Sequence, residues 1–153
     1  MSALAVLVFP GADREPLFAR RTSAESWERK GDDLMKHKLY DQAANCYTNA
    51  NNKLKVTMAV AHARAKAATE LQAQSQAKDV NVKVAYQKAA ILFLECHAES
   101  VKQNRSPEQR FYLATTGAAK CLSKGGKHSY AAQVFEKNLQ VCSIIMHKSM
   151  YLF

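Results

Sequence analysis

The sequence predicts an all-α fold of long helices joined by short connections, and two observations lead to this prediction. The middle of the 153-residue chain lacks turn-forming residues, with no proline between Pro16 and Pro107 and no glycine between Gly31 and Gly117. An all-β domain needs turn residues about every 8–12 positions, so this stretch cannot supply one. A content of 48% hydrophobic and 23% charged residues is typical of a folded globular chain and excludes wholesale disorder.

Capping and turn residues divide the chain into six expected helices. Ser23 and Ser26 offer hydroxyl groups that cap free backbone N–H groups at a first helix start. Pro107, directly after Ser106, is favoured in the first turn of the fifth helix. Gly125 or Gly126 can adopt the left-handed conformation that ends a helix. The expected helices cover residues 23–37, 39–52, 55–74, 80–103, 106–125 and 128–147.

The six helices are expected to pair into three antiparallel hairpins within one domain. The length suits a single domain, because domains commonly have about 100–200 residues. Residues 22–147 form this helical domain. Residues 1–21 are interpreted as a tail or a linker from a preceding domain, and residues 148–153 as a C-terminal tail.

Small and large residues recur at regular spacing in the first hairpin. Small residues at Gly31 and Ala43 let two helices approach closely, and large residues fill the space on either side. This order resembles the tetratricopeptide repeat (TPR), a helix–turn–helix unit of about 34 residues. Lys55 stands where that repeat usually closes on proline. The resemblance implies packing roles for Trp27, Gly31, Leu34, Tyr40, Ala43, Tyr47 and Ala50.

The other two hairpins match the TPR pattern less fully. In the third hairpin the pattern places Ala119, Leu122, Ala131 and Phe135 at packing positions. In the middle hairpin only the second helix fits, unless residues 74–81 are an insertion. The resemblance as a whole implies a short right-handed α-solenoid of about three TPR-like helical hairpins.

The run from Ala24 to Asp32, followed by Tyr40 to Tyr47, has a closer likeness. It resembles the divergent TPR stretch that follows the helicase core in large UvrD-like helicases and TPR-and-ankyrin repeat proteins. This likeness implies that the chain is part of a larger helicase-like protein. No GxxxxGK[ST] motif is present, so the sequence indicates no ATP site of its own.

The TPR resemblance also implies a concave groove that binds a protein or peptide, formed by the first helix of each hairpin. Carried over by position, its residues are Glu25, Glu28, Asp32, Met35, Lys36, Leu113, Thr116, Lys120, Ser123 and Lys124. We therefore expect a groove that is acidic at the first hairpin and basic at the third. Glu28 and Asp32 occupy the positions where chaperone-binding TPR domains hold a peptide carboxylate, which disfavours such tails.

The formal net charge of +9 keeps a second function open, which is nucleic-acid binding by an accessory segment of an ATP-dependent helicase. Lys120, Lys124 and Lys127 have the spacing of one helical face in the third hairpin. A solvated face explains the same spacing. Apolar residues near both ends of the chain also predict self-association of the isolated chain.

The sequence predicts neither an enzyme nor a cofactor or metal site. Cys96 and His97 are adjacent, so they point about 100° apart on a helix and cannot easily share one ion. The segment from Lys124 to His128 lacks the strand and the Ser/Thr of a phosphate loop, so we interpret it as a helix–helix turn. Four widely spaced cysteines indicate reduced thiols and an intracellular location, cytoplasmic or nuclear. No apolar run reaches the roughly 18 residues that span a membrane.

Overall fold

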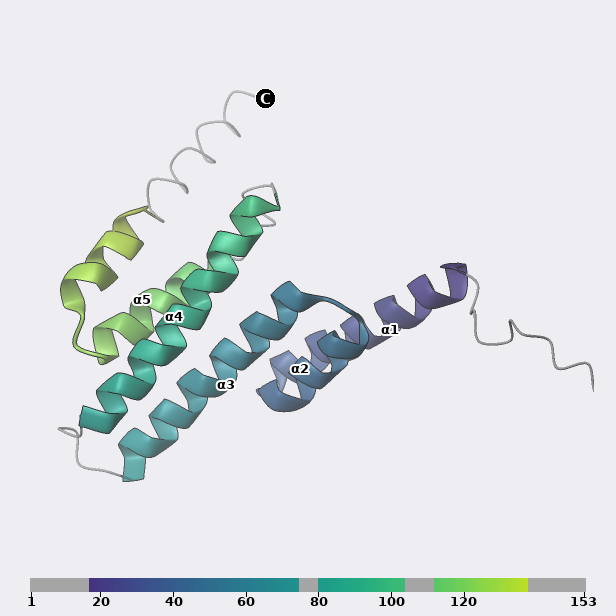
Figure 1. The fold of residues 1–153 in the computed structure, drawn as a ribbon. Helices are drawn as coiled ribbons and strands as arrows, with labels where there is room; N and C mark the ends of the chain where they lie inside the picture. Colours follow the sequence, from purple (N-terminus) through teal and green to yellow (C-terminus); the bar gives the residue numbers. More distant parts are fainter. Residues whose placement is uncertain (1–16, 75–79, 104–111, 138–153) are drawn as a thin grey trace, which may run out of the picture.

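The computed structural model describes residues 17–74, 80–103 and 112–137, and every regular element in these ranges is a helix (Figure 1). The all-α prediction is confirmed for this part of the chain. A further helical stretch, residues 128–137, follows the last labelled helix. The labelled helices are α1 (Leu17–Lys36), α2 (Tyr40–Asn49), α3 (Lys53–Gln74), α4 (Val80–Lys102) and α5 (Tyr112–Lys124).

The predicted start of the first helix is wrong. Helix α1 begins at Leu17, so Ser23 and Ser26 lie within it and cap nothing at its start. The hydroxyl signal misled because good helix formers, including Leu17 and the two arginines after Ala19, precede it. The cap predicted at Ser106 lies outside the described residues.

Three of the helix ends share one backbone geometry. The second residue after the helix has a positive φ in each case: 60° at Lys38, 55° at Asn51 and 77° at Gly126. The next backbone N–H then donates to a carbonyl five residues back, as in Leu39 N to Leu34 O at 3.0 Å. The matching bonds are Asn52 N to Tyr47 O at 2.9 Å and Lys127 N to Leu122 O at 2.8 Å. These are Schellman caps, and each one ends a helix and starts the turn that leads to the next helix.

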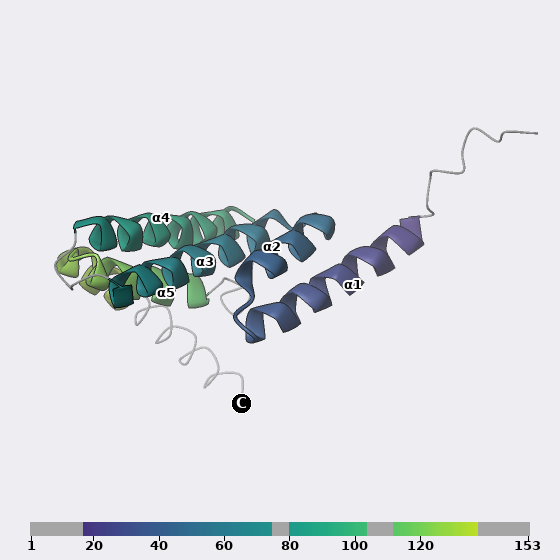
Figure 2. The same cartoon turned by 90° about the horizontal axis from the view of Figure 1, so that it is seen from below.

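Consecutive helices pack on one another along the chain. Helix α1 packs on α2, α2 on α3, α3 on α4, and α4 on α5, with a smaller contact between α3 and α5. Figure 1 shows α3 and α4 side by side and antiparallel, as the middle hairpin predicts. Seen from below, α1 slopes away from the body formed by α3, α4 and α5 (Figure 2).

The buried side chains form two separate clusters of very different size. The larger cluster joins α3, α4 and α5 around Tyr86, Phe93 and Cys96, each 1% exposed. The smaller cluster joins α1, α2 and the start of α3 through Ala43, Tyr47 and Ala59. In the described residues, no helix is long and apolar enough to cross a membrane.

Glycine allows a close helix approach at the same kind of place in both clusters. A Cβ atom on Gly31 of α1 would lie 2.5 Å from Tyr47 Cε1 on α2. A Cβ atom on Gly117 of α5 would lie 2.8 Å from Phe93 Cε1 on α4. The sequence-based expectation that Gly31 faces the second helix at close range is therefore confirmed.

The structure places the residues with expected packing roles at varied depth. Gly31, Ala43, Tyr47, Ala119 and Ala131 are buried, whereas Phe135 is 41% exposed. The partly buried members of the set are Trp27, Leu34, Tyr40, Ala50 and Leu122.

Candidate binding groove

The acidic residues expected in the first part of the groove are bound within the protein. Lys55 Nζ lies 2.7 Å from Glu28 Oε1 and 2.8 Å from Asp32 Oδ1, so one lysine pairs with both carboxylates. The Tyr47 hydroxyl donates to Asp32 Oδ1 at 2.7 Å. Lys55, the two carboxylates and Tyr47 therefore form one polar network that joins α1, α2 and α3.

This network changes the titration of its members. Burial raises the pKa of Tyr47 far above its ordinary value, and the hydrogen bond to Asp32 adds to that shift. Burial alone would lower the pKa of Lys55, but its hydrogen bonds to Asp32 and Glu28 outweigh burial and raise it. Tyr47 stays neutral and Lys55 stays charged at neutral pH, so Lys55 offsets one of the two negative charges of Glu28 and Asp32.

The remaining predicted groove residues of α1 differ in their exposure. Glu25 and Lys36 are exposed, and Lys36 pairs with Asp33 at 3.0 Å on the open surface. Met35 packs against the smaller core cluster. Exposed pairs of this kind contribute little, because water screens them.

A recess of about 710 Å³ lies between α3 and α5, and we call it the basic groove. Of the predicted residues, Thr116, Lys120 and Lys124 line it, whereas Ser123 does not. The side chain of Leu113 lies outside the described residues. The other polar or charged groove residues are Lys38, Tyr40, His62, Lys66, Thr69, Glu70, Tyr86 and Cys121.

The charge of the basic groove is strongly positive. Helix α5 supplies Lys120 and Lys124, α3 supplies Lys66, and the turn before α2 supplies Lys38. Glu70 is the one acidic residue among the described side chains that line it. Four lysines around one recess focus positive potential and favour an anionic ligand.

Aromatic rings form part of the wall of the basic groove. The ring of Tyr40 stacks on His62, with centroids 5.2 Å apart and planes 22° apart. His62 in turn meets the edge of Phe93 at 4.9 Å. Lys124 Nζ lies 5.3 Å from the centre of the Tyr86 ring, an attractive cation–π distance. Tyr86 and Phe93 are buried, so the partly exposed rings of Tyr40 and His62 are the ones a ligand could reach beside the positive charge.

Two neutral titratable groups complete the groove lining. Burial lowers the pKa of His62, which favours the uncharged imidazole at neutral pH. Burial raises the pKa of Cys121, although Lys124 partly opposes that shift. A thiol with a raised pKa is a poor nucleophile, because the thiolate is the reactive form.

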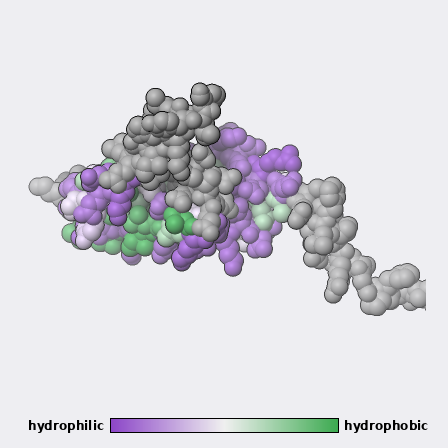
Figure 3. All heavy atoms as spheres, turned by 90° about the horizontal axis from the view of Figure 1, so that it is seen from above, coloured by the Kyte–Doolittle hydropathy of each residue, from purple (hydrophilic) through white to green (hydrophobic). Residues whose placement is uncertain are grey.

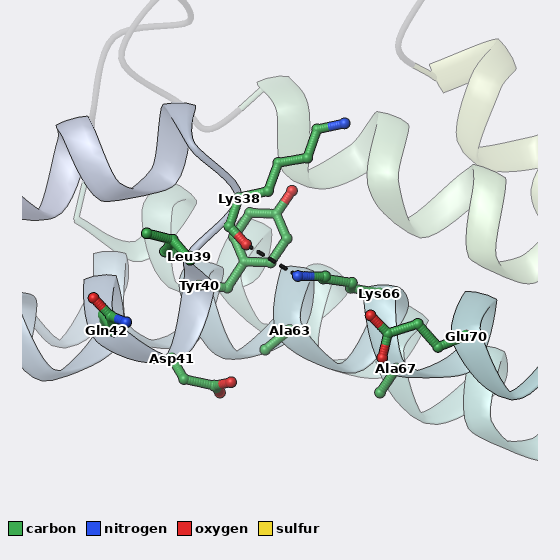
Figure 4. Close-up of a pocket in the computed structure, with 9 residues that line it drawn as sticks. All are labelled: Lys38, Leu39, Tyr40, Asp41, Gln42, Ala63, Lys66, Ala67 and Glu70. Carbon is green, nitrogen blue, oxygen red and sulfur yellow. Dashed lines mark hydrogen bonds between the residues drawn. The ribbon is translucent and has the colours of Figure 1, made fainter.

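A smaller hollow of about 210 Å³ adjoins the basic groove and shares Lys38, Tyr40, Lys66 and Glu70 with it. Figure 4 shows Lys66 extending toward the backbone oxygen of Lys38, which its Nζ atom meets at 3.5 Å. Sequence reasoning missed Lys38, His62 and Lys66 as groove residues. For the two residues of α3 the sequence did contain a signal, because His62, Lys66 and Thr69 have the spacing of one helical face.

The cysteines and acidic residues of the described part of the chain form no metal-binding cluster. No three His, Cys, Asp or Glu residues gather where they could hold a metal ion. Cys46, Cys96 and Cys121 are buried, and Cys96 Sγ lies 3.6 Å from the backbone oxygen of Leu54. The segment from Lys124 to His128 is a helix–helix turn, as the sequence predicted.

The comparisons with known proteins supply no relative for this chain: no protein-family model, no curated protein and no solved structure matches it. The groove geometry therefore stands on its own as the basis for a functional proposal.

Proposed function

We propose that the chain is a non-catalytic protein-binding module, a short right-handed α-solenoid of TPR-like hairpins that binds an acidic segment of a partner protein. The observation that supports it is the basic groove, with Lys66 and Lys120 on opposite walls. Helices α3 and α5 are the first helices of the second and third hairpins. A solenoid of this kind presents its first helices on the concave face.

The ion pairs of Lys55 favour a different ligand polarity from the one expected from the sequence. The sequence led us to expect a ligand with a basic end on α1, but Lys55 already pairs with Glu28 and Asp32. Negative charge on the ligand is instead favoured along the groove between α3 and α5. The aromatic faces of Tyr40 and His62 provide apolar contact beside that charge.

A synthetic acidic peptide tests this function. The probe is a fluorescein-labelled peptide of about 12 residues that alternates Glu with Leu and Tyr, measured by anisotropy against the full chain. Lys120→Glu should weaken binding about tenfold, because it places a like charge against the ligand. Lys53→Glu changes the net charge equally outside the basic groove and should leave the affinity within about twofold. Equal losses in the two variants would contradict the groove assignment.

A second candidate is nucleic-acid binding, because the lysines of the basic groove lie beside the accessible ring of Tyr40. Single-stranded nucleic acid binds where cations follow its backbone and bases stack on aromatic rings. Binding of a labelled single-stranded oligonucleotide should then fall steeply with salt. If only the peptide binds and the oligonucleotide does not, the protein-binding module stands alone.

We also propose that the module is part of a larger intracellular protein. The resemblance between residues 24–47 and helicase-associated repeats supports a place within a larger helicase-like protein. Buried thiols at Cys46, Cys96 and Cys121 fit a reducing intracellular compartment. The apolar chain ends that predict self-association lie outside the described residues.

A further inference from the structure

A second recess lies on the opposite side of the α3–α4 hairpin from the basic groove. Its volume is about 620 Å³, and apolar side chains on both helices line it. On α4, Val84 is 39% exposed and Ile91 is 54% exposed. They are seven residues apart, or about two helical turns, and therefore lie on one face of the helix. On α3, Ala67 and Ala68 form a low floor beside them. We call this recess the apolar groove.

The apolar surface is concentrated at this place and bordered by polar residues. Figure 3 shows an apolar patch with hydrophilic surface beside it. The described lining contains Arg64 and Lys88 but no acidic residue. An exposed apolar patch with a polar rim is typical of a surface that binds another molecule.

We propose that the apolar groove binds an amphipathic helix whose apolar stripe is flanked by acidic residues. The lining side chains form one row on α3 and one row on α4, with a channel between the two rows. A channel between two helices is a shape that can accept a third helix. Arg64 and Lys88 select acidic flanks on the incoming helix by charge complementarity.

A second copy of this chain is a poorer occupant than an acidic helix. Each copy carries a formal net charge of +9, so two apolar grooves would bring like charges together. This site is separate from the proposed peptide site, because Thr69 and Lys66 on α3 face the basic groove while Arg64 and Leu71 line the apolar one.

The test uses the full chain and a designed peptide of about 18 residues, with Leu at helical i, i+3, i+4 and i+7 spacing and Glu on its flanks. Three probes are compared by anisotropy: this peptide, a scrambled peptide of the same composition, and a version with Lys in place of Glu. The designed peptide should bind about tenfold more tightly than either of the others, because both the stripe and the acidic flanks contribute.

Two variants locate the binding. Ile91→Lys should weaken binding of the designed peptide about tenfold, because it places a charge in the apolar channel. Lys120→Glu, in the basic groove, should leave that binding within about twofold. Circular dichroism confirms that each variant keeps the helical fold, and Lys88→Glu provides a second, rim-only variant that should weaken binding of the acidic helix.

Several results would overturn the proposal. Equal binding of the scrambled peptide would show that the apolar groove does not recognise a helix. Unchanged affinity in both Ile91→Lys and Lys88→Glu would place the peptide elsewhere. A concentration-dependent dimer in sedimentation that Ile91→Lys dissociates would identify a second copy as the occupant instead.

Discussion

The first hairpin and the middle hairpin of this protein are held together in different ways. Between α1 and α2 the buried cluster is small, and Lys55 of α3 adds ion pairs to Glu28 and Asp32 of α1. Between α3 and α4 the buried cluster is larger and centres on Tyr86 and Phe93, both 1% exposed. The Tyr86 hydroxyl is also hydrogen-bonded to Thr69 and Gln72 of α3. The two helices of the middle hairpin are also the longest, with 22 and 23 residues.

The difference teaches what a repeat signature reports. The first hairpin matches the TPR pattern best, yet it has the smaller core. The signature residues Gly31 and Tyr47 specify a close approach of two helices at one point. They do not specify how much apolar area the whole hairpin buries, which depends on helix length and on neighbouring helices. Stability and sequence likeness are therefore expected to be strongest in different hairpins.

The largest expected effect comes from truncating the core of the middle hairpin. Phe93→Ala should lower the free energy of unfolding by about 3–5 kcal/mol, because it removes a fully buried ring and leaves a cavity against α5. Phe135→Ala, at a 41% exposed phenylalanine, is the control and should change it by less than about 1 kcal/mol. Urea denaturation followed by circular dichroism measures both, and similar losses would contradict a core centred on α4.

Overpacking the first hairpin should have the next largest effect. Gly31→Leu should destabilise by about 1–3 kcal/mol, because its Cβ atom alone would lie 2.5 Å from the Tyr47 ring. Part of that penalty should disappear in a Tyr47→Leu background, where the ring no longer stands in the way. Thermal denaturation compares the four proteins. An unchanged or higher melting temperature in Gly31→Leu alone would rule out the close approach.

Breaking the polar network should cost less than either packing change. Lys55→Met should lower the free energy of unfolding by about 1 kcal/mol. The effect is small because both carboxylates are more than a third exposed, so water screens their attraction to Lys55. A double-mutant cycle with Asp32→Asn measures the coupling directly. A coupling of zero would mean that the network contributes nothing to stability.

The same network sets the alkaline limit of the first hairpin. The pKa values of Tyr47 and Lys55 are both raised in the folded protein, from ordinary values of 10.0 and 10.5. Their contribution is therefore fully present below about pH 10 and is lost as the pH rises through the folded values. Tyr47→Phe should flatten this alkaline fall in melting temperature, because the pKa shift of Tyr47 is the larger of the two. A fall of the same steepness in the variant would assign it to other groups.

The smallest expected effect is an acid-side loss in the middle hairpin. The pKa of His62 is lowered by burial from its ordinary value of 6.5, so the unfolded chain takes up the proton more readily. Stability should fall as the pH drops below about 6.5 and level off below the folded pKa. His62→Gln should reduce this fall, as followed by melting temperature between about pH 7 and pH 5. A bound acidic peptide should raise the pKa of His62 in an NMR titration.

Local sequence features determined the helices and most of their ends. The missing turn residues between Gly31 and Gly117 allowed only long helices, and Gly126 marked a turn because a residue without Cβ adopts positive φ at low cost. The approach at Gly31 was also predictable, since a small residue facing a large one is a property of one helix pair. The start of α1 was not, because hydroxyl residues occur inside helices as well as at their caps.

Only the tertiary structure decided where the charges and the recesses lie. Lys55 is 23 residues from Asp32, and nothing in the local pattern indicated that it would pair with Glu28 and Asp32 of α1. Lys38, Lys66 and Lys120 come from three different segments, and they surround one groove only because α3 and α5 pack on the same helix. Periodicity fixes which face of a helix a residue occupies. The neighbours that this face meets depend on contacts between distant segments, which one sequence does not encode locally.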